Sequence, residues 1–133
     1  MKKQGIVAAA LLVSAMLLSG CTKWDKAEGP TDIRVKNLSA YVFDNVHVDT
    51  GHGENDYGTI DPGQATEYKR FEKAYREALI TLEIDGTPYT FTPVSYIYEV
   101  YLGRGKFTYE VWVEGEGENL SLDMEVNADA PLD

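Results

Sequence analysis

The stretch GKFTYEVWVEGEGENLSLDMEV, residues 105–126, carries the clearest fold signal in the chain. It contains two runs of alternating apolar and polar residues, separated by a polar, glycine-rich segment at 115–119. Alternation at every second residue is the pattern of a β-strand with one buried face. The apolar positions are Phe107, Tyr109, Val111 and Val113 in the first run, and Leu120, Leu122, Met124 and Val126 in the second. The stretch therefore predicts two strands joined by a turn.

Shorter runs of the same kind lie upstream. Residues 80–84 alternate and lead into Asp85-Gly86, a dipeptide typical of a tight hairpin turn, so a return strand is predicted over 87–91. Further strands are predicted at 31–36, at 57–60 and at 43–48, where Asp44-Asn45 interrupts the alternation as a β-bulge would. Residues 96–101 fit either a strand or an aromatic loop. About seven to nine strands at spacings of roughly 8 to 12 residues predict a mainly β chain folded as a sandwich.

The segment 61–79 is ambiguous. Asp61, Pro62 and Gln64 form a good helix start, and apolar residues recur at helical spacing after them, so an α+β fold with a helix over 62–78 is the alternative. However, residues 57–68 resemble the strand, Pro-Gly turn and strand passage of small immunoglobulin-like lipoprotein domains. The run from Tyr57 to Tyr109 is also similar to a set of uncharacterised small lipoproteins of the Bacteroides group. This resemblance implies strands, and hence an immunoglobulin-like β-sandwich.

The first 21 residues have the order of a secretory signal. Lys2 and Lys3 precede an apolar run from Ile6 to Leu18, which is shorter than the roughly 20 residues needed to span a bilayer. Leu18-Ser19-Gly20-Cys21 resembles the lipobox of bacterial lipoproteins. That resemblance implies cleavage before Cys21 and attachment of fatty acyl chains, such as palmitate, to this residue. The protein is then expected in the cell envelope, anchored to a membrane, with the outer membrane as the expected site, facing the periplasm or the cell surface.

These features predict four regions: a lipoprotein signal peptide (1–20), a lipidated tether (21–30), a β-sandwich domain (31–126) and a polar tail (127–133). Cys21 is the only cysteine, so lipid attachment leaves none for a disulfide. The 113 residues after the signal are enough for one hydrophobic core without such a bridge.

The charge of the chain restricts its partners. The full sequence has a formal net charge of −10, and without Lys2 and Lys3 it has 10 basic and 22 acidic residues, giving −12. Nucleic acid is therefore an implausible partner. We expect the acyl chains, and not the protein surface, to make the contact with anionic membrane lipids.

Metal binding has only weak candidates. His47, Asp49, His52, Glu54 and Asp56 lie close together in sequence, and the segment 49–56 is predicted to be a loop. Their spacing fails the pattern of a calcium-binding loop, and zinc requires three or four converging ligands. A solvated acidic loop is the simpler interpretation, and no metal site is assigned.

No catalytic motif is found. The sequence lacks a nucleophile elbow and a phosphate-binding glycine loop, so no cofactor is expected and the protein is not predicted to be an enzyme. An envelope hydrolase or metal-dependent enzyme using clustered carboxylates is the alternative, with Glu99 among tyrosines as the least ordinary candidate.

Aromatic residues suggest binding instead. Tyr96, Tyr98, Tyr101 and Trp112 exceed what the core face of one hairpin needs, and Trp112 falls on the face expected to be exposed. Exposed tyrosine and tryptophan are common where proteins contact proteins or sugars. We therefore expect a lipid-anchored envelope protein whose β-sandwich is an interaction or structural module, with an envelope protein or glycan as partner.

Overall fold

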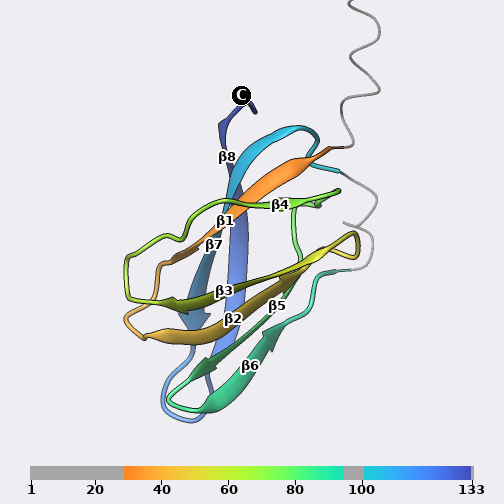
Figure 1. Cartoon of the computed structure of the whole chain (residues 1–133). Coiled ribbons are helices and arrows are strands. Elements are labelled where there is room, and N and C mark those ends of the chain that lie inside the picture. The colour runs from red at the N-terminus through yellow and green to blue at the C-terminus, as the bar shows by residue number, and fades with distance from the viewer. Residues whose placement is uncertain (1–28, 95–100, 133) are drawn as a thin grey trace, which may run out of the picture.

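The computed structural model describes residues 29–94 and 101–132, which form eight β-strands and no helix (Figure 1). The strands are β1 (Thr31–Asn37), β2 (Phe43–Asp49), β3 (Glu54–Ile60), β4 (Lys69–Phe71), β5 (Leu79–Ile84), β6 (Thr87–Phe91), β7 (Gly105–Glu114) and β8 (Ser121–Ala130). The prediction of a mainly β chain with seven to nine strands is confirmed. The described residues form no helix that is long and apolar enough to cross a bilayer.

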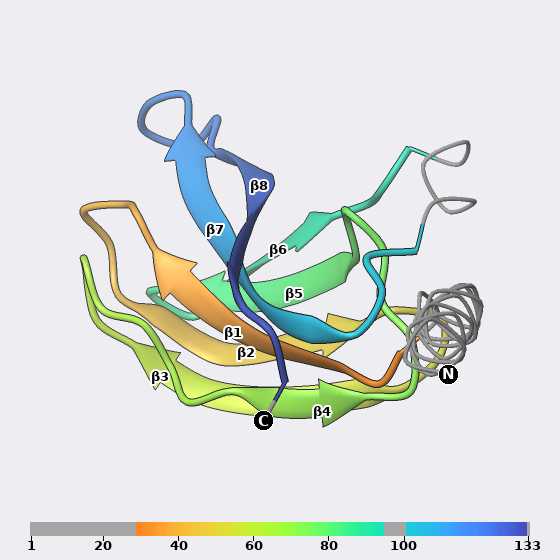
Figure 2. The same ribbon diagram turned by 90° about the horizontal axis from the view of Figure 1, so that it is seen from above.

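The strands form two sheets of four that pack against each other as a sandwich (Figures 1 and 2). One sheet has the order β4-β1-β7-β8 and the other the order β3-β2-β5-β6. β1 and β7 pair in parallel, in register from Thr31↔Gly105 to Asn37↔Val111, while the other pairs are antiparallel. The predicted sandwich is confirmed. The fold resembles immunoglobulin domains in its two-layer architecture. The likeness does not extend to the strand order, because β1 lies here between β4 and β7.

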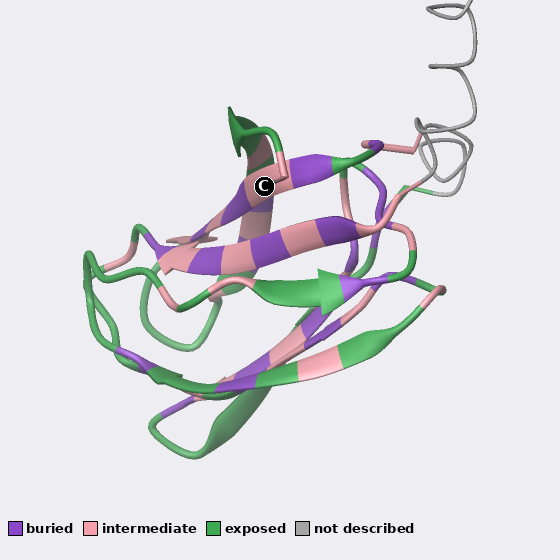
Figure 3. Ribbon diagram, turned by 45° about the horizontal axis from the view of Figure 1, so that its top comes forward, coloured by how far each residue is buried: buried purple, intermediate pink, exposed green. Residues whose placement is uncertain are grey.

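The core lies between the two sheets and follows the alternation seen in the sequence (Figure 3). Ile33 and Val35 of β1, together with Tyr109 and Val111 of β7, are fully buried. Facing them from the second sheet are buried residues of β2 and β5: Phe43, Val46, Val48, Ile80, Leu82 and Ile84. The side chains of this layer fill the gap of about 10 Å that separates stacked sheets.

Two local features match the sequence predictions. Asp85 and Gly86 have φ angles of 51° and 81°, the left-handed values of a two-residue hairpin turn, and Ile84 pairs with Thr87 across it. The pairing of β2 with both neighbours shifts register between Phe43 and His47, and Asn45 has a φ of 51°. The predicted bulge at Asp44-Asn45 is therefore confirmed.

The alternative helix over 62–78 is wrong. The amide of Gln64 donates to the carbonyl of Asp61 (3.0 Å), Gly63 has a φ of 79°, and Ala65 forms an isolated bridge with Lys36. A left-handed residue at position 63 cannot continue an α-helix. The apolar residues at helical spacing pack in the core without forming a helix, since Phe71, Ala74 and Ala78 are all buried.

Three boundaries differ from the sequence prediction. β8 continues to Ala130, so Asn127 to Ala130 belong to the sheet and not to a polar tail. β2 extends to Asp49 and β3 begins at Glu54, which leaves a loop of only residues 50–53. The strand or aromatic loop predicted at 96–101 lies outside the described residues, apart from Tyr101, which bridges to Tyr75.

Candidate interaction surface

The loops of the sandwich gather at its two opposite ends (Figure 2). β1 and β7 both run from the end where the chain enters β1 to the other end. We define the near end as residues 29–31, 50–53, 72–78, 92–94 and 101–104, and the far end as residues 38–45, 60–65, 83–88 and 113–120.

Charge is divided unevenly between these ends. The near end is almost balanced, with Lys73, Arg76 and Arg104 against Glu72 and Glu77. The far end contains no Lys or Arg but seven acidic residues: Asp44, Asp61, Glu83, Asp85, Glu114, Glu116 and Glu118. The far end therefore has a formal charge of −7, and the net charge of −10 for the whole chain does not reveal this uneven distribution.

Asn37, the last residue of β1, organises the far end. Its side chain is fully buried, and its Nδ2 donates to the carbonyl oxygens of Tyr41 (2.7 Å) and Ile60 (2.9 Å). Its Oδ1 accepts hydrogen bonds from the amide (2.8 Å) and the hydroxyl (2.7 Å) of Ser39. Its own backbone pairs with Gly63 and Gln64 of the next turn. Because its partners are Ser39 and Tyr41 of the loop and Ile60 of β3, the Asn37 side chain ties residues 38–42 to the end of the sandwich.

This fixed loop exposes apolar side chains. Leu38, Tyr41 and Val42 are 45%, 38% and 41% exposed, and Val94, at the near end, is the one other large apolar residue with comparable exposure in the described part of the chain. Single exposed apolar residues are ordinary, but three on one five-residue loop form a patch. The loop that Asn37 holds therefore exposes an apolar patch.

A groove of about 410 Å³ lies beside this loop. Tyr41, Ile84, Tyr89 and Leu120 supply its apolar lining, while Asp85 and Glu118 add two exposed carboxylates. The lining comes from both sheets, because Ile84 and Tyr89 belong to β5 and β6 and Leu120 precedes β8. The groove therefore exists only in the assembled sandwich.

The near end holds an aromatic cluster of His52, Tyr75 and Tyr101. The rings of Tyr75 and Tyr101 stack at 4.8 Å, and the His52 ring lies 5.9 Å from each. Nε2 of His52 is 3.1 Å from the Tyr75 hydroxyl, and Lys73 Nζ lies 4.9 Å above the Tyr101 ring. A hydrogen bond with Tyr101, together with burial, raises the pKa of Tyr75 to about 12. Because these side chains contact one another, the main role of the cluster is to hold the 72–78 loop in place.

The weak metal candidates fall into two places. Nδ1 of His47 lies 2.6 Å from Asp56 Oδ1, and its Nε2 lies 2.9 Å from Glu54 Oε1. Hydrogen bonds to Asp56 and Glu54 raise the pKa of His47, since both ring nitrogens donate only in the imidazolium form. His52 instead contacts Tyr75, and Asp49 accepts from the amide of Gly51. Among the described residues, no group of three or more His, Cys, Asp or Glu side chains could hold a metal ion.

The aromatic residues predicted to bind a partner do not lie together. Tyr101 precedes β7 at the near end, whereas Trp112 lies near the other end of β7, where its Nε1 is 3.4 Å from Glu114 Oε1. Trp112 is half-buried and points to the outer face, as expected from its phase in the strand. Tyr96, Tyr98 and Glu99 lie outside the described residues, as does Cys21.

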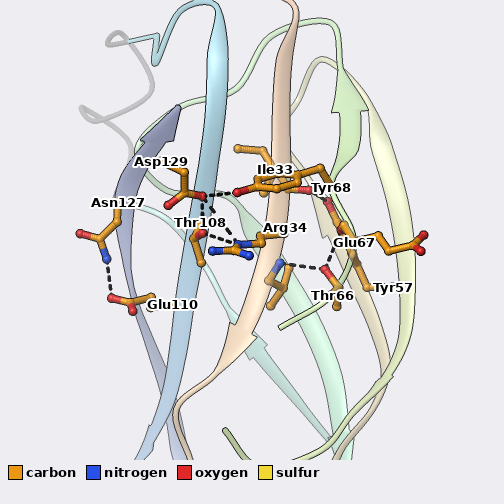
Figure 4. A network of polar contacts seen from close by, with 11 residues as sticks. Ile33, Arg34, Tyr57, Thr66, Glu67, Tyr68, Thr108, Glu110, Asn127 and Asp129 are labelled. Carbon is orange, nitrogen blue, oxygen red and sulfur yellow. Dashed lines mark hydrogen bonds and ion pairs between the residues drawn. The ribbon is translucent and has the colours of Figure 1, made fainter. Parts of the chain in front are cut away.

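A polar network covers the outer face of the first sheet (Figure 4). Asp129 Oδ2 accepts hydrogen bonds from the hydroxyls of Tyr68 (2.7 Å) and Thr108 (2.5 Å), and Arg34 Nε donates to Thr108 Oγ1 (2.8 Å). Burial and the bond to Asp129 raise the pKa of Tyr68. On the same face, Asn127 donates to Glu110. The network joins β1, β7 and β8, and it explains why β8 continues through residues that are polar in sequence.

Searches with this chain found no similar family model, characterised protein or solved structure.

The far-end residues were not identified as candidates from the sequence. Asn37 differs from an ordinary loop residue only in following a buried strand and preceding Ser39 by two positions, which is the local pattern of an Asx turn. Leu38, Tyr41 and Val42 could have been noticed as apolar residues between two strands. Their exposure, however, depends on how the loop closes on Ile60 and the turn at 63–64.

Proposed function

We propose that this chain is a lipid-anchored cell-envelope protein whose β-sandwich is an interaction module with its binding surface at the far end. The observation that carries the binding role is the patch of Leu38, Tyr41 and Val42, held by Asn37 beside a groove with both apolar and acidic side chains. Exposed apolar surface that is fixed in advance loses little conformational entropy when a partner binds.

The anchor is proposed from the lipobox, Leu18-Ser19-Gly20-Cys21. Acyl chains on Cys21 would hold the protein at a membrane, since each buried CH₂ contributes about 0.8 kcal/mol. Only nine residues, 22–30, separate Cys21 from β1, and a tether of that length spans roughly 15 to 18 Å on average. The near end would therefore lie close to the membrane.

Charge favours the same orientation. The near end is almost neutral, whereas the seven carboxylates of the far end would be repelled by anionic lipid headgroups. The far end would then face away from the bilayer, where partners are accessible.

The anchor is tested by growing cells with an alkynyl fatty acid and measuring its incorporation into the full-length protein. The wild type should take up label and fractionate with membranes. The Cys21→Ala variant should do neither, while Ser19→Ala, which keeps a small residue in the lipobox, should behave as wild type. An unlabelled wild type would overturn the proposal.

A further inference from the structure

We infer that the far-end groove receives a lysine or arginine side chain of a protein partner, whose neighbouring apolar residues cover Leu38 and Val42. This inference rests on the proposed function and specifies the chemistry of the partner.

The groove combines two kinds of surface. Tyr41, Tyr89 and Leu120 offer apolar and aromatic contact, and Asp85 and Glu118 offer negative charge at the same hollow. Lys and Arg are the side chains that match this combination, because an aliphatic stem of three or four methylenes ends in a cation. Their cationic groups also interact favourably with tyrosine rings.

The acidic residues of the far end as a whole also favour a basic partner. None of the far-end residues is basic, so the seven carboxylates have no cation within their own segments. Two of them, Asp44 and Glu83, lie outside the groove lining and are directly paired in the ladder between β2 and β5. Each accepts a hydrogen bond from a neutral side chain, Asp44 from Thr59 (3.0 Å) and Glu83 from Asn45 (3.3 Å), and neither is paired with a cation in the far-end segments. Like charges directly opposite one another in a sheet are destabilising. A cationic partner would relieve this repulsion.

Other occupants fit less well. The carboxylates would repel anionic lipid and nucleic acid. A bare metal cation would leave the apolar patch uncovered, and the described residues contain no metal-binding group of three or more ligands. A protein segment with basic and apolar side chains can pair with the carboxylates and also cover the apolar patch.

The test uses the full-length protein in intact cells, with a photoreactive phenylalanine at position 42, which is exposed and directly follows Tyr41 of the groove lining. After irradiation, adducts are identified by mass spectrometry. We expect a protein adduct whose crosslinked segment contains Lys or Arg. Both groove carboxylates are replaced in the double variant Asp85→Asn, Glu118→Gln. This variant should lower the yield of the protein adduct about five- to tenfold, the size expected for two partly exposed ion pairs.

The variants are chosen to preserve the fold. Asparagine tolerates the left-handed φ of 51° at position 85, so the hairpin turn should be retained. Glu125→Gln, an exposed carboxylate on β8 outside the far end, is the matched control and should leave the yield unchanged.

The outcomes separate the two proposals. A protein adduct in a segment without basic residues, or a yield insensitive to the groove variant, overturns the inference and leaves far-end binding intact. An adduct with lipid or with a second copy of this chain also overturns it. If position 42 forms no adduct at all, far-end binding falls as well.

Discussion

The two ends of the sandwich use their unusual residues in opposite ways. At the near end, His52, Tyr75 and Tyr101 contact one another, and three basic residues stand against two acidic ones. At the far end, Asn37 satisfies the loop backbone internally, while Leu38, Tyr41 and Val42 are left exposed near seven carboxylates whose segments contain no basic residue. Conspicuous aromatic residues can therefore serve packing, whereas a surface suited to a partner leaves apolar side chains exposed beside charges of one sign.

The largest expected effect tests whether Asn37 holds the far end. Asn37→Ala removes two donated and two accepted hydrogen bonds, so the carbonyl of Ile60 loses its side-chain donor and that of Tyr41 keeps only the Ser39 hydroxyl. We expect the free energy of unfolding to fall by about 3 kcal/mol. Chemical denaturation measures this. Asn55→Ala, which loses one exposed bond to Arg70, should cost less than about 1 kcal/mol. Equal losses in the two variants would refute the role of Asn37.

A second prediction concerns the near end. The buried hydroxyl of Tyr109 donates to the carbonyl of Tyr75 (2.6 Å) and ties the 72–78 loop to β7. Tyr109→Phe should lower the free energy of unfolding by about 1 to 2 kcal/mol, because the buried carbonyl loses its donor. Tyr41→Phe, at an exposed tyrosine, serves as the control and should change stability very little. No loss in Tyr109→Phe would mean that the near end is held by other contacts.

The third prediction separates stability from binding at the far end. Leu38→Ser combined with Val42→Ser changes exposed side chains, so the free energy of unfolding should stay within about 0.5 kcal/mol of wild type. Copurification of the crosslinked partner should nevertheless be lost. Denaturation curves and partner recovery are measured on the same preparations. A large loss of stability would show that the loop supports the core rather than displaying a surface.

The smallest effect involves His47, which lies in the middle of β2 and belongs to neither end. Its raised pKa means that the contacts with Asp56 and Glu54 stabilise the fold fully below the unfolded value of about 6.5, and that this stabilisation disappears as pH rises through the folded pKa. His47→Gln should therefore cost a few tenths of a kcal/mol at pH 5 and almost nothing at pH 9. The comparison is made by denaturation at both pH values. A cost that is independent of pH would contradict it.

Sequence patterns were sufficient where the fold depends on neighbouring residues. The alternation at 105–126, the Asp85-Gly86 turn and the bulge at Asp44-Asn45 are all local features, and each was predicted correctly. The extension of β8 to Ala130 was missed because Asn127 and Asp129 are stabilised by Glu110, Tyr68 and Thr108, which are distant in sequence.

The candidate surface was harder to predict for the same physical reason. A loop residue is assigned as exposed or buried only when its long-range partners are known, and Asn37 reaches Ile60 and Gln64 across the sandwich end. The charge difference between the ends likewise depends on the strand order, because the seven acidic residues come from four separate segments of the chain.

We propose that a protein partner binds the far end of the sandwich and not the near end. Val42 and Val94 provide a matched pair for testing it, since both valines are similarly exposed, at 41% and 45%, and lie at opposite ends. A photoreactive phenylalanine is placed at each position in turn in the full-length protein, and adducts from intact cells are compared. We expect protein adducts from position 42 and none from position 94. Protein adducts from position 94 with none from position 42 would contradict it.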